Sequence, residues 1–174
     1  SIVGPADEVL DLWSLLEPQW GPCRELRPNQ PLLVMDAPSA VAPDPLVRYA
    51  RRDELELIVP ACVDMFTQEV GISPVAHGGG HVYTARIAEL IGANRSIVRI
   101  DDGEVVFKAE IGAATPDACQ VQGVWVSPNR RGEGLSVPAM AAVVGIALAD
   151  IATTVSLYVN DFNLAGRTYR VTMQ

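Results

Sequence analysis

The feature that most constrains the fold is a junction where a β-rich run ends and a long apolar helix begins. Residues 119–126 favour a strand that ends at Pro128, and residues 130–134 then supply two arginines and two glycines. Residues 134–150 are apolar over a helical length. A strand that passes through a short turn into a helix is typical of mixed α/β proteins, in which the helix packs back onto the sheet.

The turn at this junction has the properties of an anion-binding site. The first amides of a helix lack intrahelical partners and carry partial positive charge, and glycines let a ligand approach the backbone closely. With the two arginines, the turn suits a pyrophosphate. A simpler interpretation stays open, in which Gly132 and Gly134 only permit the turn. A P-loop does not fit because the only lysine, Lys108, lies elsewhere, and a GxGxxG fingerprint does not fit because residue 137 is Val.

Strand and helix patterns continue along the chain from about residue 46. Asp102 and Gly103 separate two β-rich runs and predict a hairpin. Asp53 is a helix cap, and the helix it begins should end at Gly71. The expected elements are strands at 47–50, 96–100, 104–111, 119–126 and 154–159, and helices at 53–70, 83–91, 134–150 and 163–170.

Residues 1–36 are predicted to be the end of a preceding subdomain with the order strand, helix, strand. The strands are expected at residues 1–4 and 32–35, and Pro18 is expected to stop the helix between them. Residues 37–45 are rich in proline and small residues and predict a linker. Residues 46–174 would then form the main unit.

Composition narrows the class of protein. The net charge of −8 gives no basic face for nucleic acid, and no apolar run is long enough for a membrane span. Cys23, Cys62 and Cys119 are widely spaced and include no CxxC, which argues against a zinc site and suits a reducing cytoplasm. We therefore expect a cytoplasmic protein that binds neither nucleic acid nor membrane and holds no metal.

The junction resembles motif A of the GNAT superfamily of N-acetyltransferases. That motif is a strand followed by Arg/Gln-x-x-Gly-x-Gly/Ala and a helix, and here it reads Arg131-Gly-Glu-Gly-Leu-Ser136. The preceding Val126-Ser-Pro128 matches the Val-x-Pro of the family. Ser136 replaces the usual Gly or Ala. The resemblance covers about residues 46–170 and includes the order of strands and helices.

The resemblance implies a mixed, mostly antiparallel sheet flanked by helices, with a splayed strand pair at the acyl-CoA site. Acetyl-CoA would be the cosubstrate, with its pyrophosphate on the glycine turn and its pantetheine along the strand before it. The Val126 amide would polarise the thioester carbonyl. The residues that would contact acetyl-CoA are Val124, Trp125, Val126, Arg131, Gly132, Glu133, Gly134, Leu135, Ser136 and Asn163.

A second matching segment follows the strand at 154–159. Asn163 and Tyr169 resemble the Asn-x-x-Ala-x-x-x-Tyr segment of the family, with one residue fewer between them. By that resemblance Asn163 would bind pantetheine and Tyr169 would protonate the leaving thiolate. The two strands that normally end the family's fold are missing from the sequence, so either the chain is cut, or the strands are disordered or come from elsewhere. With residues 1–36 as the end of a preceding acetyltransferase-like half, the whole chain resembles the C-terminal part of actinobacterial two-part GNAT proteins, and we expect it to be bacterial.

The general base that would deprotonate an amine has three candidates: Glu69, Glu110 and Asp117. Each could also be a solvated carboxylate. His77 and His81 enclose three glycines and predict a mobile loop near the acceptor, because glycine opposes the helix that would bring both histidines to one metal.

Two functions follow from the resemblance. The first is transfer of acetyl from acetyl-CoA to an amine, on a small molecule or a protein, by direct attack in a ternary complex. The second is a non-catalytic acyl-CoA sensor or scaffold. A homodimer is compatible with either.

Overall fold

The computed structural model describes residues 2–160, which form one six-stranded sheet with the strand order β1-β6-β5-β4-β3-β2. Only β5 and β6 pair in parallel, and the other neighbours are antiparallel. The strands are β1 (Leu32–Met35), β2 (Arg48–Tyr49), β3 (Ser96–Asp101), β4 (Glu104–Ala114), β5 (Ala118–Val126) and β6 (Thr154–Tyr158). The helices are α1 (Ala6–Trp20), α2 (Leu55–Val70), α3 (Gly80–Gly92) and α4 (Ser136–Asp150), with short 3-10 turns at Arg52–Glu54, Ala76–Gly78 and Pro128–Arg130.

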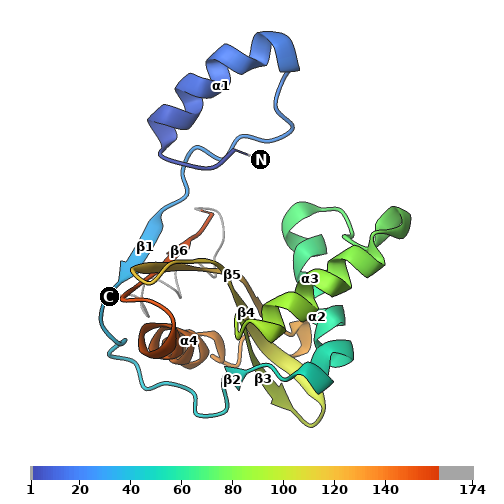
Figure 1. Ribbon diagram of the computed structural model, residues 1–174, viewed down its shortest axis with the longest axis vertical. Coiled ribbons are helices and arrows are strands. Elements are labelled where there is room, and N and C mark those ends of the chain that lie inside the picture. The colour runs from blue at the N-terminus through green and yellow to red at the C-terminus, as the bar shows by residue number, and fades with distance from the viewer. Residues whose placement is uncertain (1, 161–174) are drawn as a thin grey trace.

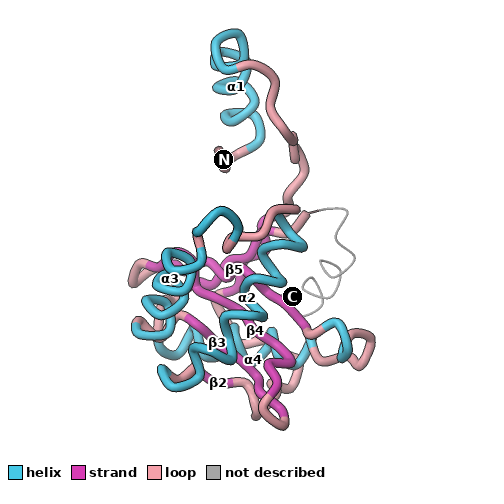
Figure 2. The backbone as a smooth tube through the Cα atoms, turned by 90° about the vertical axis from the view of Figure 1, so that its right-hand side faces the viewer, coloured by secondary structure: helices cyan, strands magenta, loops and turns pink. Residues whose placement is uncertain are grey.

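Helices cover both faces of the sheet, so the core has two layers. In Figure 1 and Figure 2, α4 lies on one face and α2 and α3 lie on the other. The α4 layer buries Met140 and Val143 of the helix against Phe107 of β4. The α2 and α3 layer buries Ile58 and Cys62 against the opposite face. The mixed α/β class and the mostly antiparallel sheet predicted from the sequence are confirmed.

Local signals set most of the element boundaries. Asp102 and Gly103 both have positive φ, +49° and +79°, which is the backbone of a two-residue type I′ hairpin turn. Gly71 adopts the left-handed conformation at the end of α2, and its N–H donates to the carbonyl of Thr67. The predicted hairpin and the predicted end of this helix are therefore confirmed.

β5 and β6 separate soon after they begin. Their register contains three pairs, from Ala118 with Thr154 to Gln120 with Ser156. β5 continues for six more residues to Val126 without a partner on this side among residues 2–160. The two strands therefore form a V that opens toward their C-terminal ends. This gap is the splayed strand pair that the sequence predicted.

The N-terminal segment differs from the prediction in three ways. Residues 2–4 form no strand, and Pro18 does not stop α1, which continues to Trp20. Pro18 removes the hydrogen bond to the carbonyl of Ser14, and water can replace that bond because Ser14 is exposed. The third difference is that β1 pairs antiparallel with β6, so it belongs to the sheet of the main unit.

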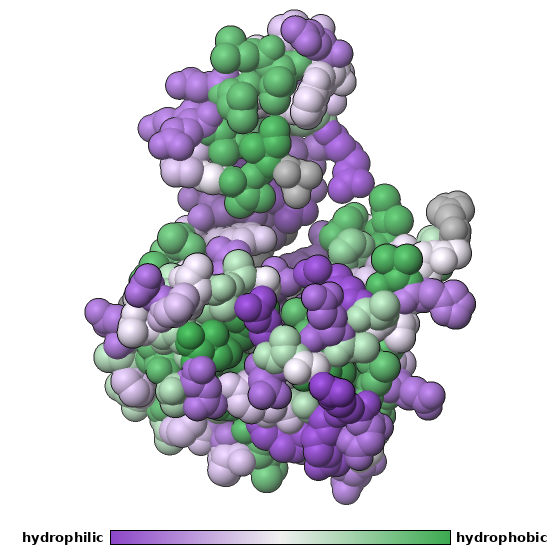
Figure 3. All heavy atoms as spheres, viewed as in Figure 1, coloured by the Kyte–Doolittle hydropathy of each residue, from purple (hydrophilic) through white to green (hydrophobic). Residues whose placement is uncertain are grey.

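α1 stands apart from the sheet, and none of its residues is buried. Leu12, Leu15 and Trp20 on this helix are among the large apolar side chains left exposed. Apolar surface accordingly covers much of the N-terminal helix in Figure 3.

The segment from His77 to His81 is helical, so the predicted loop is wrong. The chain forms a 3-10 turn at Ala76–Gly78 and enters α3 at Gly80. A Cβ on Gly79 would lie 2.6 Å from the carbonyl oxygen of Pro74, so this glycine allows a close backbone approach. Within the described part of the chain, no cluster of three or more His, Cys, Asp or Glu side chains could hold a metal ion. Nor does any helix there have the length and hydropathy to cross a bilayer.

Candidate active site

The glycine turn before α4 is open to a ligand. Gly132 and Gly134 have φ of +85° and +77°, in the left-handed region that disfavours other residues. A Cβ added at either position would have no heavy atom within 4 Å. Apart from their immediate chain neighbours, no described residue therefore fills the space at these two glycines.

The amides that follow Arg131 in this turn are free of hydrogen bonds within the described part of the chain. The first helical bond of α4 runs from the Ala139 N–H to the Leu135 carbonyl, and no side chain caps the helix. Among residues 2–160, the N–H groups from Gly132 to Val137 have no hydrogen-bond partner. Ser136 is the first residue of the helix. This run of free donors at the positive end of a fifteen-residue helix can hold a phosphate or a pyrophosphate.

The two arginines of the turn have different partners. Arg130 pairs with Glu133 at 2.8 Å and with Asp101 at 3.4 Å, so its charge is offset. Arg131 donates from Nη2 to Gln68 Oε1 at 2.7 Å and from Nε to the Val126 carbonyl at 3.2 Å. Both partners of Arg131 are neutral. Arg131 therefore retains a full positive charge beside the free amides, whereas Arg130 and Glu133 fix the turn.

The backbone N–H of Val126 faces the gap between β5 and β6. The Ser127 N–H donates to the Val106 carbonyl at 3.0 Å, so Val126 and Phe107 are a non-hydrogen-bonded pair of the β4–β5 ladder. The Val126 N–H consequently points away from β4, into the gap. Val124, two residues earlier on the strand, has the same orientation.

Trp125 lies between these two residues and faces the other way. Its side chain is buried in the α2 and α3 layer. Trp125 lies opposite Lys108, and these two residues form a hydrogen-bonded pair of the ladder, so the Trp125 amide points at β4. Of the three predicted residues on this strand, Val124 and Val126 reach the gap and Trp125 does not.

Two of the three candidate bases lie near one another, under the end of α2. Glu110 is buried on β4 and accepts a hydrogen bond from Lys108 Nζ at 2.7 Å. Glu69 lies in the last turn of α2, where its side chain remains accessible to water. Crowding by the surrounding protein desolvates the Glu69 carboxylate and raises its pKa above 4.5, and the positive charge of Lys108 opposes this effect.

The other predicted catalytic and binding residues lie outside this cluster. Asp117 is exposed at the beginning of β5, where β5 and β6 are still paired. At about 3.3 Å per residue, the length of β5 places it roughly 25 Å or more from the Val126 end of the gap. Asn163 and Tyr169 lie outside the described residues.

Three residues at the site were not assigned a role from the sequence. Lys108 binds Glu110, Gln68 binds Arg131, and Gly123 adopts a positive φ of +57° inside β5. An isolated glycine within a strand pattern can indicate a bulge, so Gly123 carried a signal. Gln68 carried none, because Arg131 is distant in the sequence, and nothing near Lys108 in the sequence indicated its bond to the Gly123 carbonyl, fifteen residues away.

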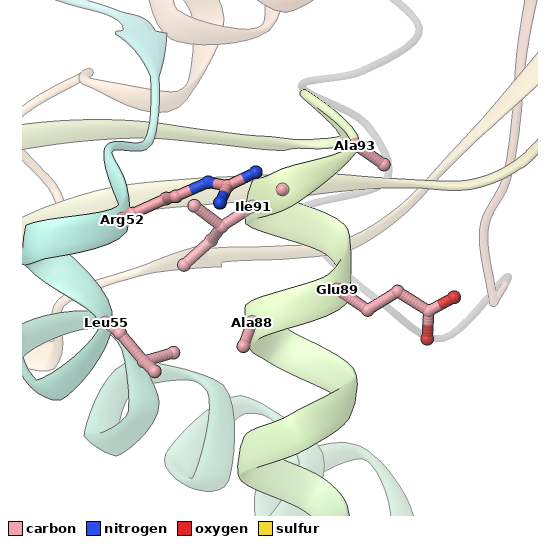
Figure 4. A pocket seen from close by; sticks show the side chains of 7 residues that line it. Arg52, Leu55, Ala88, Glu89, Ile91 and Ala93 are labelled. Carbon is pink, nitrogen blue, oxygen red and sulfur yellow. The ribbon is translucent and has the colours of Figure 1, made fainter.

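Two cavities lie away from the turn. One of about 630 Å³ is lined by residues of the first turn of α2 and the end of α3. Figure 4 shows Arg52 extending across it toward Ala93. Another of about 430 Å³ lies beside α2 and is lined in part by Trp125 and Pro128. None of the free amides of the glycine turn lines either cavity.

Comparison with protein families gives a match at the N-terminus only. Residues 1–58 match a family described as a domain of unknown function, DUF4081. This match includes α1 and β1 and ends in the first turn of α2. A search of curated proteins found none that matches the chain.

Solved structures match a much larger part of the chain. A predicted acetyltransferase with acetyl-CoA from Clostridium acetobutylicum is 16% identical, with a TM-score of 0.57 over 71% of this chain and 85% of the other. A GNAT-family acetyltransferase of Colwellia psychrerythraea is 12% identical, with a TM-score of 0.62 over 83% of this chain and 52% of the other. A GCN5-related N-acetyltransferase of Ralstonia eutropha is 17% identical, with a TM-score of 0.52 over 71% and 88%. The chain therefore has the fold of the GNAT N-acetyltransferases.

Proposed function

We propose that the chain is an N-acetyltransferase that moves acetyl from acetyl-CoA to an amine by direct attack in a ternary complex. The observation that carries the proposal is the placement of free donors along one route. The amides of residues 132–137, unbonded among the described residues, lie just before and at the start of α4, and the Val126 N–H faces the gap that leads from them. A pyrophosphate on the turn would direct pantetheine along β5 and bring the thioester carbonyl to Val126.

The residues of the turn fit the cosubstrate. Gly132 and Gly134 leave room for phosphate oxygens, and Arg131 supplies a charge that no carboxylate of residues 2–160 offsets. Leu135 and Ser136 would contribute backbone amides, and Glu133 would act indirectly by holding Arg130. Cys23, Cys62 and Cys119 are all unpaired, which supports a reducing cytoplasm as the place of action.

The reaction requires a neutral amine. Glu69 would accept the proton of the ammonium group, and its raised pKa brings it closer to that task than an ordinary carboxylate. The amine nitrogen then attacks the thioester carbon, and the Val126 N–H stabilises the oxyanion. The attacking nitrogen loses its extra proton to solvent, and as the C–S bond breaks, sulfur leaves with the electron pair and takes up a proton. The role of Tyr169 as donor of that proton stays a prediction.

Two measurements test the function. Calorimetric titration with acetyl-CoA should give saturable binding, and incubation with a panel of amines should release free thiol at a rate that depends on the amine. Absence of binding at high micromolar acetyl-CoA would refute the proposal. Tight binding without turnover on any amine would favour the sensor or scaffold instead.

A further inference from the structure

β5 contains one residue more than the facing part of β4. Lys108 of β4 lies opposite Trp125, but Glu110, two residues further, lies opposite Gln122, which is three residues from Trp125. Gly123, with φ of +57°, lies within this irregular step. β5 therefore has a β-bulge immediately before the residues that reach the gap.

The bulge determines where the Val126 amide points. Successive residues of a strand direct their N–H groups alternately to the two sides, so one inserted residue reverses the direction for every residue after it. Without the bulge, the Val126 N–H would pair with β4. With the bulge it faces the gap, as the bond from Ser127 to Val106 requires.

A buried ion pair holds the bulge. Lys108 is fully buried, and its Nζ donates to Glu110 Oε1 at 2.7 Å and to the Gly123 carbonyl at 3.1 Å. Cys62 Sγ lies 3.6 Å from the same oxygen of Glu110. The bulge carbonyl thus has an ammonium donor, and the carboxylate balances the charge of that donor.

The pair is a costly way to achieve stability alone. Desolvating two charges offsets much of their attraction, and apolar residues of similar volume often serve a fold as well or better. The Lys108 ammonium donates to the carbonyl of Gly123, the glycine within the bulge, and this contact indicates a role in geometry. It is also the only lysine of the chain.

We propose that Lys108 is a positioning residue for acyl transfer. Its ammonium holds the Gly123 carbonyl, fixes the bulge and so aims the Val126 N–H at the thioester oxygen. Glu110 neutralises Lys108 in this arrangement, which leaves Glu69 as the base. The inference rests on the proposed function, because the direction of the Val126 N–H matters only if a thioester reacts beside it.

The main test removes both charges together, so that no unpaired charge stays buried. The double variant Lys108→Met/Glu110→Leu should melt cooperatively and bind acetyl-CoA within about threefold of the parent, because the glycine turn is intact. Its kcat should fall about 100-fold, as for loss of an oxyanion donor. A folded double variant that keeps kcat within about threefold would overturn the proposal.

A single variant covers the case in which the double variant does not fold. Glu110→Gln leaves an oxygen acceptor for Lys108 and leaves the bond from Lys108 to Gly123 in place. Lys108 then lacks its counter-charge, so this variant should be less stable than the parent, but the rising limb of its pH profile should remain because Glu69 is unchanged. Disappearance of the rising limb would make Glu110 the base and overturn the account given for Lys108.

Amide hydrogen exchange tests the geometry without turnover. In the parent, Val126 should exchange faster than Trp125, because only Trp125 donates to β4. In the double variant this difference should disappear. If the parent acetylates no amine and the exchange result holds, the proposed function fails while the clamp on the bulge stands. An unchanged difference in the double variant would refute the clamp itself.

Discussion

Replacement of Gly134 by Asp should weaken acetyl-CoA binding through the negative charge of the new side chain, beyond the backbone cost that any side chain has at this position. Gly134 has φ of +77° and open space around an added Cβ, so the side chain fits and the cost lies in the backbone. Asn is the matched control, because Asp and Asn both tolerate the left-handed conformation better than other residues and have nearly the same shape. The difference between the two variants therefore isolates one negative charge beside the pyrophosphate.

The magnitude follows from the exposure of the turn. Two unit charges about 4 Å apart repel by about 1 kcal/mol in bulk water and about 4 kcal/mol near a protein surface. Since residues 131–134 are exposed, a value of about 2.5 kcal/mol is expected, or roughly a 70-fold difference in Kd between Asp and Asn. Calorimetry at low and high ionic strength measures it, and the difference should shrink at high salt. Equal affinities for the two variants at low salt would refute the pyrophosphate site.

Three further predictions concern charge, pH and the core. Arg131→Met should raise the Kd for acetyl-CoA about tenfold or more, while Arg130→Met should have a smaller effect because its charge is already offset; titration compares them. The rising limb of kcat/KM should lie above pH 4.5 and vanish in Glu69→Gln. The raised pKa means that the Glu69 carboxyl binds its proton more tightly in the folded protein than in the unfolded chain, so the folded state loses stability as the pH rises through that pKa. Glu69→Gln removes this loss and should therefore raise Tm more at pH 7 than at pH 4. Ile58→Ala should cost about 2–5 kcal/mol in urea unfolding and exposed Ile72→Ala less than about 0.5 kcal/mol; equal losses would contradict the core assignment.

The parts of the fold that were predicted correctly depend on local chemistry. The hairpin at Asp102 and Gly103 and the helix end at Gly71 follow from backbone conformations that few other residues adopt. The turn at Gly132 and Gly134 was predicted for the same reason. In each case the local structure is set by the backbone preferences of a few residues that are adjacent in the sequence.

The errors have tertiary causes. Three consecutive glycines oppose a helix by propensity, yet the close approach of Gly79 to Pro74 needs a residue without a Cβ, and the chain there becomes helical. Pro18 fails to end α1 because the carbonyl it leaves unpaired is exposed to water. β1 precedes a proline-rich linker and looked separate, but its backbone completes the free edge of β6.

The candidate site also has one part that depends on local sequence and another that depends on tertiary contacts. The donors proposed for the pyrophosphate are mainly backbone amides of one short turn, so a sequence motif can reveal them. The proposed chemistry at the acceptor involves residues from the end of α2, the middle of β4 and a bulge in β5, which only the folded sheet brings together. Lys108 and Gly123 are fifteen residues apart, and their bond exists only because a hairpin returns β5 to β4 with one residue too many. An open turn with free amides can therefore be predicted from the sequence, whereas the geometry proposed to make it catalytic cannot.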